Sequence, residues 1–327
     1  METKIKSIGV LTSGGDAPGM NAAIRAVVRT ALYYDLKVFG IKQGYHGMVF
    51  NKIHPLRSQD VAATIQRGGT ILRTARCKEF MTDEGIKMAY ENLKKNEIDA
   101  LVVIGGDGSF RGATEFQKKF GVPIVGLPGT IDNDIYGTDV TIGYDTALNT
   151  VVEAVDKIRD TASSHDRMFF VEVMGRHAGF LALRSAIACG AEAVLIPEVD
   201  SEIDKFINYL ENGYRRKKSS NIILVAEGEK AGGAFQVVEK LKPYLQDYDV
   251  RVSILGHLQR GGSPSAYDRY IATKMGVAAV KALIENKSGI MIGIVNEKIV
   301  EVPLEKAIKL NKTIDIDDVH IIDIMNV

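Results

Sequence analysis

The sequence has no tryptophan, only two cysteines, Cys77 and Cys189, and no excess of either charge. The missing tryptophan excludes no class of protein. Two cysteines, however, are too few for a disulfide framework and lack the spacing of a zinc site. Lysine and arginine (41) balance aspartate and glutamate (41), so the formal net charge is zero. This balance argues against a protein that binds nucleic acid or an acidic surface through its overall charge.

No apolar run approaches the length of a membrane span, and no signal peptide follows the charged start of the chain, Met1 to Lys4. We therefore expect a cytoplasmic protein. A composition of 46% apolar and 25% charged residues is that of an ordinary globular chain. The length of 327 residues suggests two domains rather than one large core.

Apolar runs that end in glycine-rich turns alternate with helical segments, which is typical of an α/β fold with mainly parallel sheets. We expect strands at 5–11, 37–42, 99–104, 122–127, 168–173, 191–196, 221–226, 250–255 and 290–295. We expect helices at about 20–34, 83–95, 141–162, 201–218 and 264–285. Ser263 and Pro264 are the expected N-cap and first residue of the last helix. The segments after residue 163 predict a second α/β domain of the same design.

Two aspartates lie in the turn 129–134, directly after the apolar run 122–127. A Pro-Gly pair ends that strand, so Asp132 and Asp134 should stand at its carboxyl end, where open α/β sheets bind ligands. One carboxylate can then face a reacting group while the other orients a metal or a neighbour. Asp-Asn-Asp triplets are also common in ordinary turns, so the triplet alone leaves both interpretations open.

Two glycine-rich turns, 12–19 and 105–109, each connect a predicted strand to a predicted helix. Such turns point backbone amides and the positive end of a helix at a phosphate. The first turn has neither the Walker nor the dinucleotide-binding pattern, so the phosphate interpretation depends on both turns together. In the second turn, glycines around Asp107 allow close approach to a triphosphate and leave the carboxylate for Mg²⁺, usually through water.

Several arginines are candidate anion contacts. Arg25 and Arg29 lie four residues apart on one helix face, which is either solvated surface or a second anion site. Arg73 and Arg76 follow the Gly-Gly turn at residues 68–69 and fit surface exposure and phosphate contact equally well.

A further anion site is expected near the end of the strand 250–255. Arg251, His257 and Arg260 should gather there beside a helix N-terminus. A lone histidine in such a place is more often a hydrogen-bonded structural residue, but the two arginines favour an anion.

Taken together, these segments resemble the bacterial ATP-dependent 6-phosphofructokinases. The matching motifs are the segments 12–21, 105–109, 128–134, 174–176 and 256–263, in the family's order and over nearly the whole chain. The resemblance implies two Rossmann-like three-layer domains with an active-site cleft between them, in a homotetramer. It implies that residues 1–143 plus 258–309 bind ATP and that residues 144–257 plus 310–327 bind fructose 6-phosphate.

The resemblance also implies roles for individual residues. Asp132 is the general base that takes the proton from the 1-hydroxyl of fructose 6-phosphate, and the hydroxyl oxygen attacks the γ-phosphate of ATP. The other residues of the catalytic set are Thr130, Asp134, Arg176, Arg76 and Gly15. The implied nucleotide contacts are Gly15, Tyr45, Arg76, Cys77, Gly106, Asp107, Gly108 and Ser109, with Asp107 also holding Mg²⁺. The implied sugar-phosphate contacts are Thr130, Ile131, Asp132, Arg167, Met174, Gly175, Arg176, Glu227, Arg251, His257, Leu258, Gln259 and Arg260. Of these, Arg167 and Arg251 are expected to reach in from a neighbouring subunit.

The phosphoryl donor is inferred from two glycines. Pyrophosphate-using relatives tend to carry Asp and Lys at the positions of Gly108 and Gly129, which blocks room for the nucleotide's α-phosphate; glycine at both positions favours ATP. A pyrophosphate-dependent enzyme and a non-catalytic sugar-phosphate or nucleotide sensor on the same fold are the alternatives. A sensor needs no general base, so the presence of Asp107, Asp132 and Arg176 argues against it.

The family's effector site, which takes ADP or phosphoenolpyruvate, maps onto Arg25, Arg29, Arg159, Gly190, Glu192, Arg216 and Lys218. The sequence departs from the family here. Ser58 stands where an arginine is common, and Ser219 and Ser220 replace a Lys-His-like pair. Fewer positive charges predict weaker anion binding and leave the strength of allosteric control open. Met81 similarly replaces an arginine found near the nucleotide in relatives, which leaves the adenine affinity open.

Overall fold

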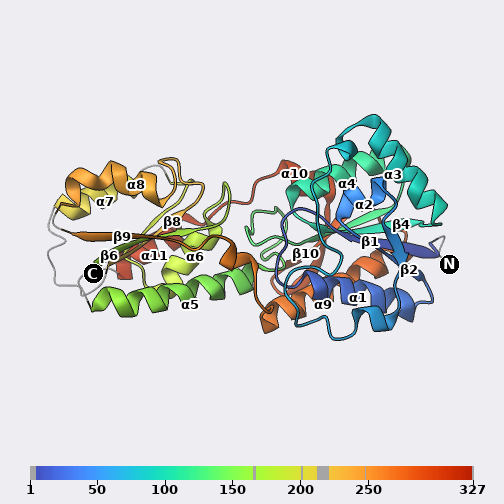
Figure 1. Ribbon diagram of the computed structural model, residues 1–327, viewed down its shortest axis with the longest axis horizontal. Coiled ribbons are helices and arrows are strands. Elements are labelled where there is room, and N and C mark those ends of the chain that lie inside the picture. Colours follow the sequence, from blue (N-terminus) through green and yellow to red (C-terminus); the bar gives the residue numbers. More distant parts are fainter. Residues whose placement is uncertain (1–4, 165–166, 200–201, 212–220, 247, 326–327) are drawn as a thin grey trace. The chain divides into compact units, whose positions relative to one another are not determined.

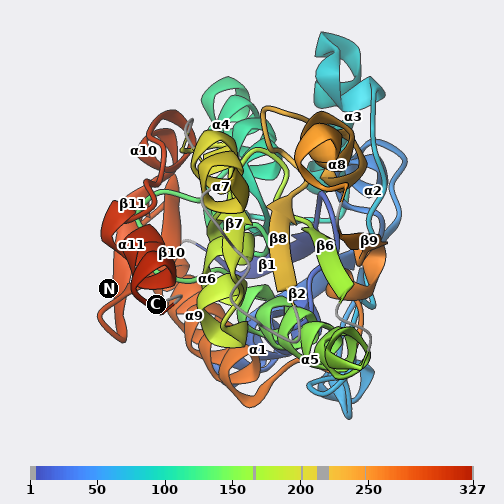
Figure 2. The same cartoon turned by 90° about the vertical axis from the view of Figure 1, so that its left-hand side faces the viewer.

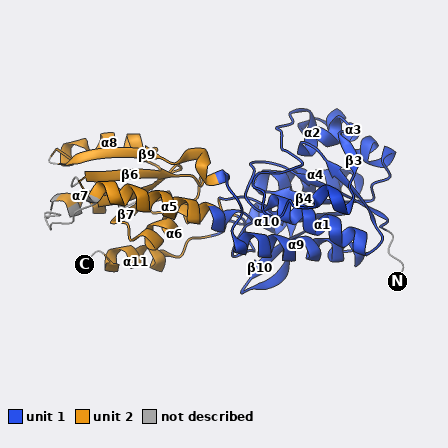
Figure 3. Ribbon diagram, turned by 60° about the horizontal axis from the view of Figure 1, so that its bottom comes forward, with its two compact units in different colours: residues 1–131, 135–146, 260–312 blue, residues 132–134, 147–259, 313–327 orange. Residues whose placement is uncertain are grey.

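The computed structural model describes residues 5–164, 167–199, 202–211, 221–246 and 248–325, and it divides into two compact units (Figures 1 and 3). Unit 1 comprises residues 1–131, 135–146 and 260–312, and unit 2 comprises residues 132–134, 147–259 and 313–327. The chain therefore passes between the units after residues 146, 259 and 312, against domain boundaries expected after residues 143, 257 and 309. The short segment 132–134 groups with unit 2, although its chain neighbours on both sides belong to unit 1.

A seven-stranded, mainly parallel sheet forms the centre of unit 1 in its described residues. In sheet order the strands are β11 (Lys298–Pro303), β10 (Ile290–Val295), β5 (Ile124–Pro128), β4 (Ala100–Gly105), β1 (Ser7–Thr12), β2 (Lys37–Ile41) and β3 (Ile53–Pro55). The outer strands β11 and β3 run antiparallel to their neighbours. β1 and β4 are buried along their whole length, as expected for central strands covered on both faces.

Helices cover both faces of this sheet (Figure 1). α1 (Met20–Tyr33) and α9 (Ala266–Ile284) pack against each other on one face. α2 (Gly44–Val49), α3 (Asp83–Lys95) and α4 (Asp107–Phe120) cover the other face, with α10 (Leu304–Lys309) beside α4. Leu93 of α3 and Phe116 of α4 are buried with Leu101 and Val103 of β4 in one apolar cluster. This packing fixes α4 against the strand that precedes it.

Unit 2 contains, within its described residues, a four-stranded parallel sheet (Figure 2). Its strands, in sheet order, are β7 (Ala193–Leu195), β8 (Asn221–Ala226), β6 (Arg167–Val173) and β9 (Asp249–Ile254). α7 (Glu202–Glu211) and α8 (Ala234–Leu241) cover one face, while α5 (Tyr144–Ser163) and α6 (Phe180–Cys189) cover the other. The last helix, α11 (Ile316–Met325), packs beside α6. Phe170 and Ile223 of the sheet meet Phe206 and Val237 of the helices in the core.

The predicted α/β class with mainly parallel sheets is confirmed. Helix 83–95 and strands 221–226 and 290–295 have the predicted bounds. The predicted cap of α9 is wrong: the Ser265 hydroxyl accepts the Asp268 amide at 3.1 Å, so Ser265 is the N-cap and Ala266 the first helical residue. The Ser263 hydroxyl instead donates to the Gln66 carbonyl at 2.7 Å.

Part of one predicted helix cannot be compared with the structure. Of the segment 201–218, α7 is described, whereas Ser201 and residues 212–218 lie outside the described residues. None of the helices in the described ranges combines the length and apolar content that a membrane span requires.

Candidate active site

Three loops leave the same edge of the unit 1 sheet because β1, β4 and β5 are parallel neighbours. Thr12 at the end of β1 is paired with Ile104, and Gly105 at the end of β4 is paired with Pro128. The loops that follow, 13–16, 105–109 and 129–131, therefore begin side by side at the carboxyl edge of the sheet. The two predicted glycine turns and the start of the Asp132 turn come together in this way.

The first loop takes its shape from glycine. Gly14 has φ +85°, a left-handed conformation that glycine adopts without strain. A Cβ on Gly15 would lie 2.6 Å from Nη1 of Arg260, so the guanidinium lies directly on the loop. The same Nη1 donates to the Asp16 carbonyl at 3.2 Å. Arg260, predicted as a contact of the sugar phosphate, is thus seated against the predicted nucleotide loop.

The second loop forms the N-terminus of α4. Gly106 is the N-cap residue, and Asp107 begins the helix, whose first amides have no acceptor within their own helix. A Cβ on Gly108 would meet nothing within 4 Å, so this glycine faces open space. At Gly129 a Cβ would lie 3.0 Å from Ile104 Cγ2 and 3.1 Å from Met20 Cε, so a side chain here would be tightly packed. The steric argument for ATP is therefore clearest at Gly108.

Asp107 fits the role of a magnesium ligand. It is a carboxylate at a helix N-terminus beside amides that suit phosphate, and Mg²⁺ prefers oxygen ligands. Among the described residues no group of three or more His, Cys, Asp or Glu side chains is close enough to hold a metal. An ion here would take its other ligands from water and phosphate oxygens, the usual pattern for Mg²⁺. The carboxylate also accepts a hydrogen bond from Arg111 Nε at 2.9 Å, a contact that the spacing of four residues allows and that our sequence reasoning missed.

Tyr45 supports the second loop through a hydrogen bond to its backbone. Its hydroxyl donates to the Ser109 carbonyl at 2.5 Å, and its ring stacks on Phe80 with centroids 4.2 Å apart. Burial raises the pKa of Tyr45, so it remains a neutral hydrogen-bond donor. Cys77 is half-buried, with a pKa raised by burial, and its thiol contacts the Glu79 carboxylate at 3.4 Å. Arg76, next in the chain to Cys77, is exposed.

The Asp132 turn carries a buried carboxylate on a strained backbone. Asp132 is 3% exposed, and its Oδ2 lies 3.5 Å from Nε of Arg176. Asn133 and Arg176, beside and opposite this carboxylate, have φ of +54° and +55°. Residues other than glycine adopt this backbone conformation at a cost in energy, and residues that do so cluster at functional sites. Asp134 is half-buried.

Four predicted substrate residues of unit 2, Met174, Gly175, Arg176 and Glu227, follow the carboxyl ends of β6 and β8. Glu227, just after β8, accepts the Arg176 amide at 2.6 Å and the Gly175 amide at 3.4 Å. The buried Gln259 accepts the Met174 amide at 3.1 Å through Oε1. These contacts fix the loop 174–176 and, through it, the Arg176 guanidinium beside Asp132.

Two predicted phosphate arginines lie at the other edge of the same sheet. Arg167 begins β6 and is paired in register with Asp249, the first residue of β9. Asp249 bonds both guanidinium groups: Arg167 Nε at 2.8 Å and Arg251 through Nη1. The expectation placed Arg251 with His257 and Arg260 near the end of β9. Arg251 instead lies near the start of β9, and His257 follows its end.

His257 and Leu258 belong to the short helix η4 (Gly256–Arg260), and both side chains are exposed. The buried Gln259 is the next residue in η4. The sequence placed these residues correctly after the strand, and the extended strand itself separates them from Arg251.

The predicted effector residues are distributed over both units. In unit 2, Arg159 Nη2 donates to the Cys189 carbonyl at 2.7 Å and the Gly190 carbonyl at 3.0 Å, and its Nη1 lies 3.8 Å from Glu192. In unit 1, Arg25 and Arg29 share a face of α1, and burial together with the neighbouring Arg29 charge lowers the pKa of Arg25. Of the positions that depart from the family, Ser58 begins the short helix η1 (Ser58–Val61) and Met81 ends η2 (Glu79–Met81). The remaining residues lie outside the described ranges: Arg216, Lys218, Ser219 and Ser220.

The chain belongs to the phosphofructokinase family, whose model, described as "Phosphofructokinase", matches residues 7–283. It is 60% identical to ATP-dependent 6-phosphofructokinase 2 of Bacteroides thetaiotaomicron, over 97% of this chain and 98% of the relative. It is 53% identical to ATP-dependent 6-phosphofructokinase 1 of Thermus thermophilus, over 95% of this chain and 96% of the relative. The structure of phosphofructokinase from Saccharomyces cerevisiae matches with a TM-score of 0.87 at 41% identity, covering 93% of this chain and 45% of the yeast chain. This chain therefore spans less than half the length of the yeast protein.

Proposed function

We propose that this chain transfers the γ-phosphoryl group of ATP to the 1-hydroxyl of fructose 6-phosphate, giving fructose 1,6-bisphosphate and ADP, a step of glycolysis. The observation that carries the proposal is the buried Asp132 carboxylate, which lies beside Arg176. Its turn follows β5 in the chain, a strand that pairs with β4 at the sheet edge from which both glycine loops leave. The names of the relatives at 60% and 53% identity support ATP as the donor.

Asp132 is the proposed general base. A carboxylate oxygen takes the proton of the sugar's 1-hydroxyl as that oxygen attacks the γ-phosphorus, and the leaving group is ADP. Arg176 has two uses at this point: it balances the Asp132 charge in the resting state, and it can stabilise negative charge on the transferring phosphoryl group. Thr130, Ile131 and Asp134 flank the base in the same turn and complete the proposed substrate contacts.

The glycine loops are the proposed seat of the nucleotide phosphates. Gly15, Gly106 and Gly108 offer backbone amides, and α4 adds the positive end of its dipole. Ser109 is a proposed contact in the same turn, although its amide donates to the Gly106 carbonyl at 3.0 Å. Asp107 is the residue that would hold Mg²⁺, which when bound neutralises charge on the β- and γ-phosphates. Tyr45 contributes by holding this loop, because its hydroxyl donates to the Ser109 carbonyl.

The remaining predicted contacts concern the sugar phosphate and the assembly. Met174, Gly175, Glu227 and Gln259 hold one another and shape the loop beside Arg176. Arg167 and Arg251 lie at the opposite edge of their sheet from that loop, which fits the prediction that they serve the site of a neighbouring subunit. The homotetramer, the effector and the cytoplasmic location remain predictions.

An assay with each donor supplied separately tests the proposal. The protein is given fructose 6-phosphate and Mg²⁺ with ATP or with pyrophosphate, and fructose 1,6-bisphosphate is measured through a coupled aldolase reaction. We expect product with ATP and none with pyrophosphate. Product with pyrophosphate alone would replace ATP as the donor. Calorimetric binding of both ligands without product would favour a sensor over an enzyme.

A further inference from the structure

A buried aspartate outside the predicted site joins two helix N-termini in unit 1. Asp268, in the first turn of α9, has no exposed surface. Its Oδ1 accepts the Gly143 amide at 2.7 Å, and its Oδ2 accepts both the Thr146 amide at 2.8 Å and the Thr146 hydroxyl at 2.5 Å. A buried carboxylate is costly unless it is hydrogen-bonded, and these donors from the start of α5 supply the bonds.

The two helices also cap each other in the opposite direction. The Ser265 hydroxyl donates to Asp145 Oδ2 at 2.5 Å, and the Ser265 amide donates to the Thr146 hydroxyl at 2.9 Å. The carboxylates of Asp145 and Asp268 thus lie at helix N-termini, where the helix dipole favours negative charge. The segment 143–146 is held in place by α9.

This anchored segment is in turn bonded to the strand and turn that lead to Asp132. The Ile142 amide donates to the Pro128 carbonyl at 2.8 Å, and Ile142 forms a bridge with Gly129. The Thr141 hydroxyl, fully buried, donates to the Thr130 carbonyl at 2.6 Å. Thr130 precedes Asp132 by two residues, so this bond holds the backbone close to the proposed base.

The same segment also lies under the exit of the first glycine loop. A Cβ on Gly143 would lie 2.6 Å from the Ala17 Cβ, and a Cβ on Gly19 would lie 2.8 Å from Ile142 Cγ2. Both glycines have positive φ, +102° and +108°, as this close packing demands. The hydrogen-bonded segment 141–146 therefore packs against the start of the Asp132 turn and against the residues that follow the nucleotide loop.

We propose that Thr141 and Asp268 are positioning residues for the phosphoryl transfer. Asp268 fixes the segment 143–146, and Thr141 hydrogen-bonds the adjoining backbone to the turn that carries Asp132. Neither residue is expected to touch substrate. This inference rests on the proposed function, because it takes Asp132 as the base whose position matters.

Thr141→Val tests the inference most directly, since it removes the hydroxyl and keeps the branched shape. We expect kcat to fall about tenfold, the effect of removing one buried hydrogen bond next to the reacting group. The KM for ATP should stay within about twofold, because the bond that is removed joins Thr141 to the Asp132 turn. Thr141→Ser keeps the hydroxyl and should restore most of the turnover. Asp268→Asn, which places an amide group against the Gly143 and Thr146 donors, should lower kcat in the same way.

Thr114→Val is the matched control. Thr114 is also a buried threonine of unit 1, and its hydroxyl donates to the Phe110 carbonyl at 2.9 Å within α4. We expect wild-type kcat from this variant. If Thr141→Val and Thr114→Val have the same kcat, the positioning role is refuted.

Hydrogen–deuterium exchange separates this inference from the proposed function. In Thr141→Val the amides of residues 129–134 should exchange about tenfold faster than in wild type, and in Thr114→Val they should not change. Unchanged exchange in Thr141→Val overturns the inference even if the wild-type enzyme is active. A wild-type protein that makes no fructose 1,6-bisphosphate would overturn the proposed function, whereas the exchange result would still decide whether Thr141 fixes the turn.

Discussion

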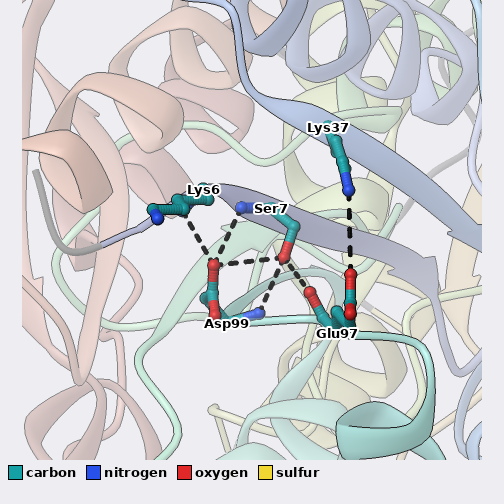
Figure 4. A network of polar contacts seen from close by, with 5 residues as sticks. All are labelled: Lys6, Ser7, Lys37, Glu97 and Asp99. Atoms are coloured by element: carbon teal, nitrogen blue, oxygen red, sulfur yellow. Dashed lines mark hydrogen bonds and ion pairs between the residues drawn. The ribbon is translucent and has the colours of Figure 1, made fainter.

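At the amino ends of β1 and β4, polar groups of the chain satisfy one another (Figure 4). Asp99 Oδ2 accepts the Lys6 amide at 2.8 Å and the Ser7 amide at 3.0 Å, and the Ser7 hydroxyl donates to the Glu97 carbonyl. Lys37 at the start of β2 lies 3.7 Å from the Glu97 carboxylate. The network joins the starts of neighbouring strands.

At the carboxyl ends of the same strands the loops carry glycines and the N-terminus of a helix. Gly14 adopts a left-handed conformation, Gly108 faces open space, and Asp107 starts a helix whose first amides lack acceptors within that helix. This difference supports the proposal that polar residues at one edge stabilise the fold, whereas those at the other edge bind a ligand. Substitutions at the two edges should therefore separate stability from activity.

Apart from substitutions of Asp132 itself, the largest loss of turnover is expected at Arg176. Arg176→Gly removes the guanidinium but suits the backbone, because φ is +55°. We expect kcat to fall about a hundredfold, as for the loss of a charge-stabilising donor, with a melting temperature no lower than that of wild type. Steady-state kinetics and calorimetry measure the two. The control is Arg269→Ala on α9, whose side chain bonds Pro264 and Ser263 just before the helix. Wild-type turnover in Arg176→Gly would contradict the proposed role.

The next effect is a pH dependence of stability. Burial raises the pKa of Asp268 to about 6, partly offset by hydrogen bonds from Thr146 and Gly143, and the neighbouring Asp145 charge raises it further. A carboxyl group with a raised pKa stabilises the fold below its unfolded pKa of 3.8, and this contribution is lost as the pH rises through about 6.

Urea unfolding of wild type and Asp268→Asn from about pH 4 to pH 7 measures this loss. The free energy of unfolding of wild type should fall by about 2 kcal/mol relative to the variant over that range. A difference that rises with pH would mean that the native state favours the ionised carboxylate.

The smallest effect is expected at the amino edge. Asp99→Ala should lower the free energy of unfolding by about 1–2 kcal/mol, because exposed hydrogen bonds contribute modestly, and should leave kcat unchanged. Lys37→Ala, which removes an exposed ion pair from the same network, should cost less than about 0.5 kcal/mol. Chemical denaturation and the coupled assay measure both quantities. A tenfold loss of turnover in Asp99→Ala would break the distinction between the two edges.

The central strands and the three loops were predictable because their signals are local. Apolar runs that end in glycine mark β1, β4 and β5, and parallel pairing then brings Gly14, Asp107 and the Asp132 turn to one edge. The hairpin between β10 and β11 was missed because its turn residues, Asn296 and Glu297, have φ of +49° and +62° without the usual glycine.

The support beneath the site was not predictable in the same way. The Asp268 bonds join residues more than 120 positions apart in the chain. No spacing in the sequence indicates that pairing, and the only local signal was the serine three residues before Asp268, which resembles an N-cap. Arg251 was misplaced because an extended strand separates residues that lie close in number.

Turnover and substrate binding of Asp132→Asn, measured on one preparation, test the central claim most directly. The account predicts that fructose 6-phosphate still binds, by calorimetry, with an affinity within about threefold of wild type, while kcat falls by roughly two to four decades, the range for loss of a general base. Turnover near that of wild type would contradict the account, because the carboxylate could not then be the group that accepts the proton.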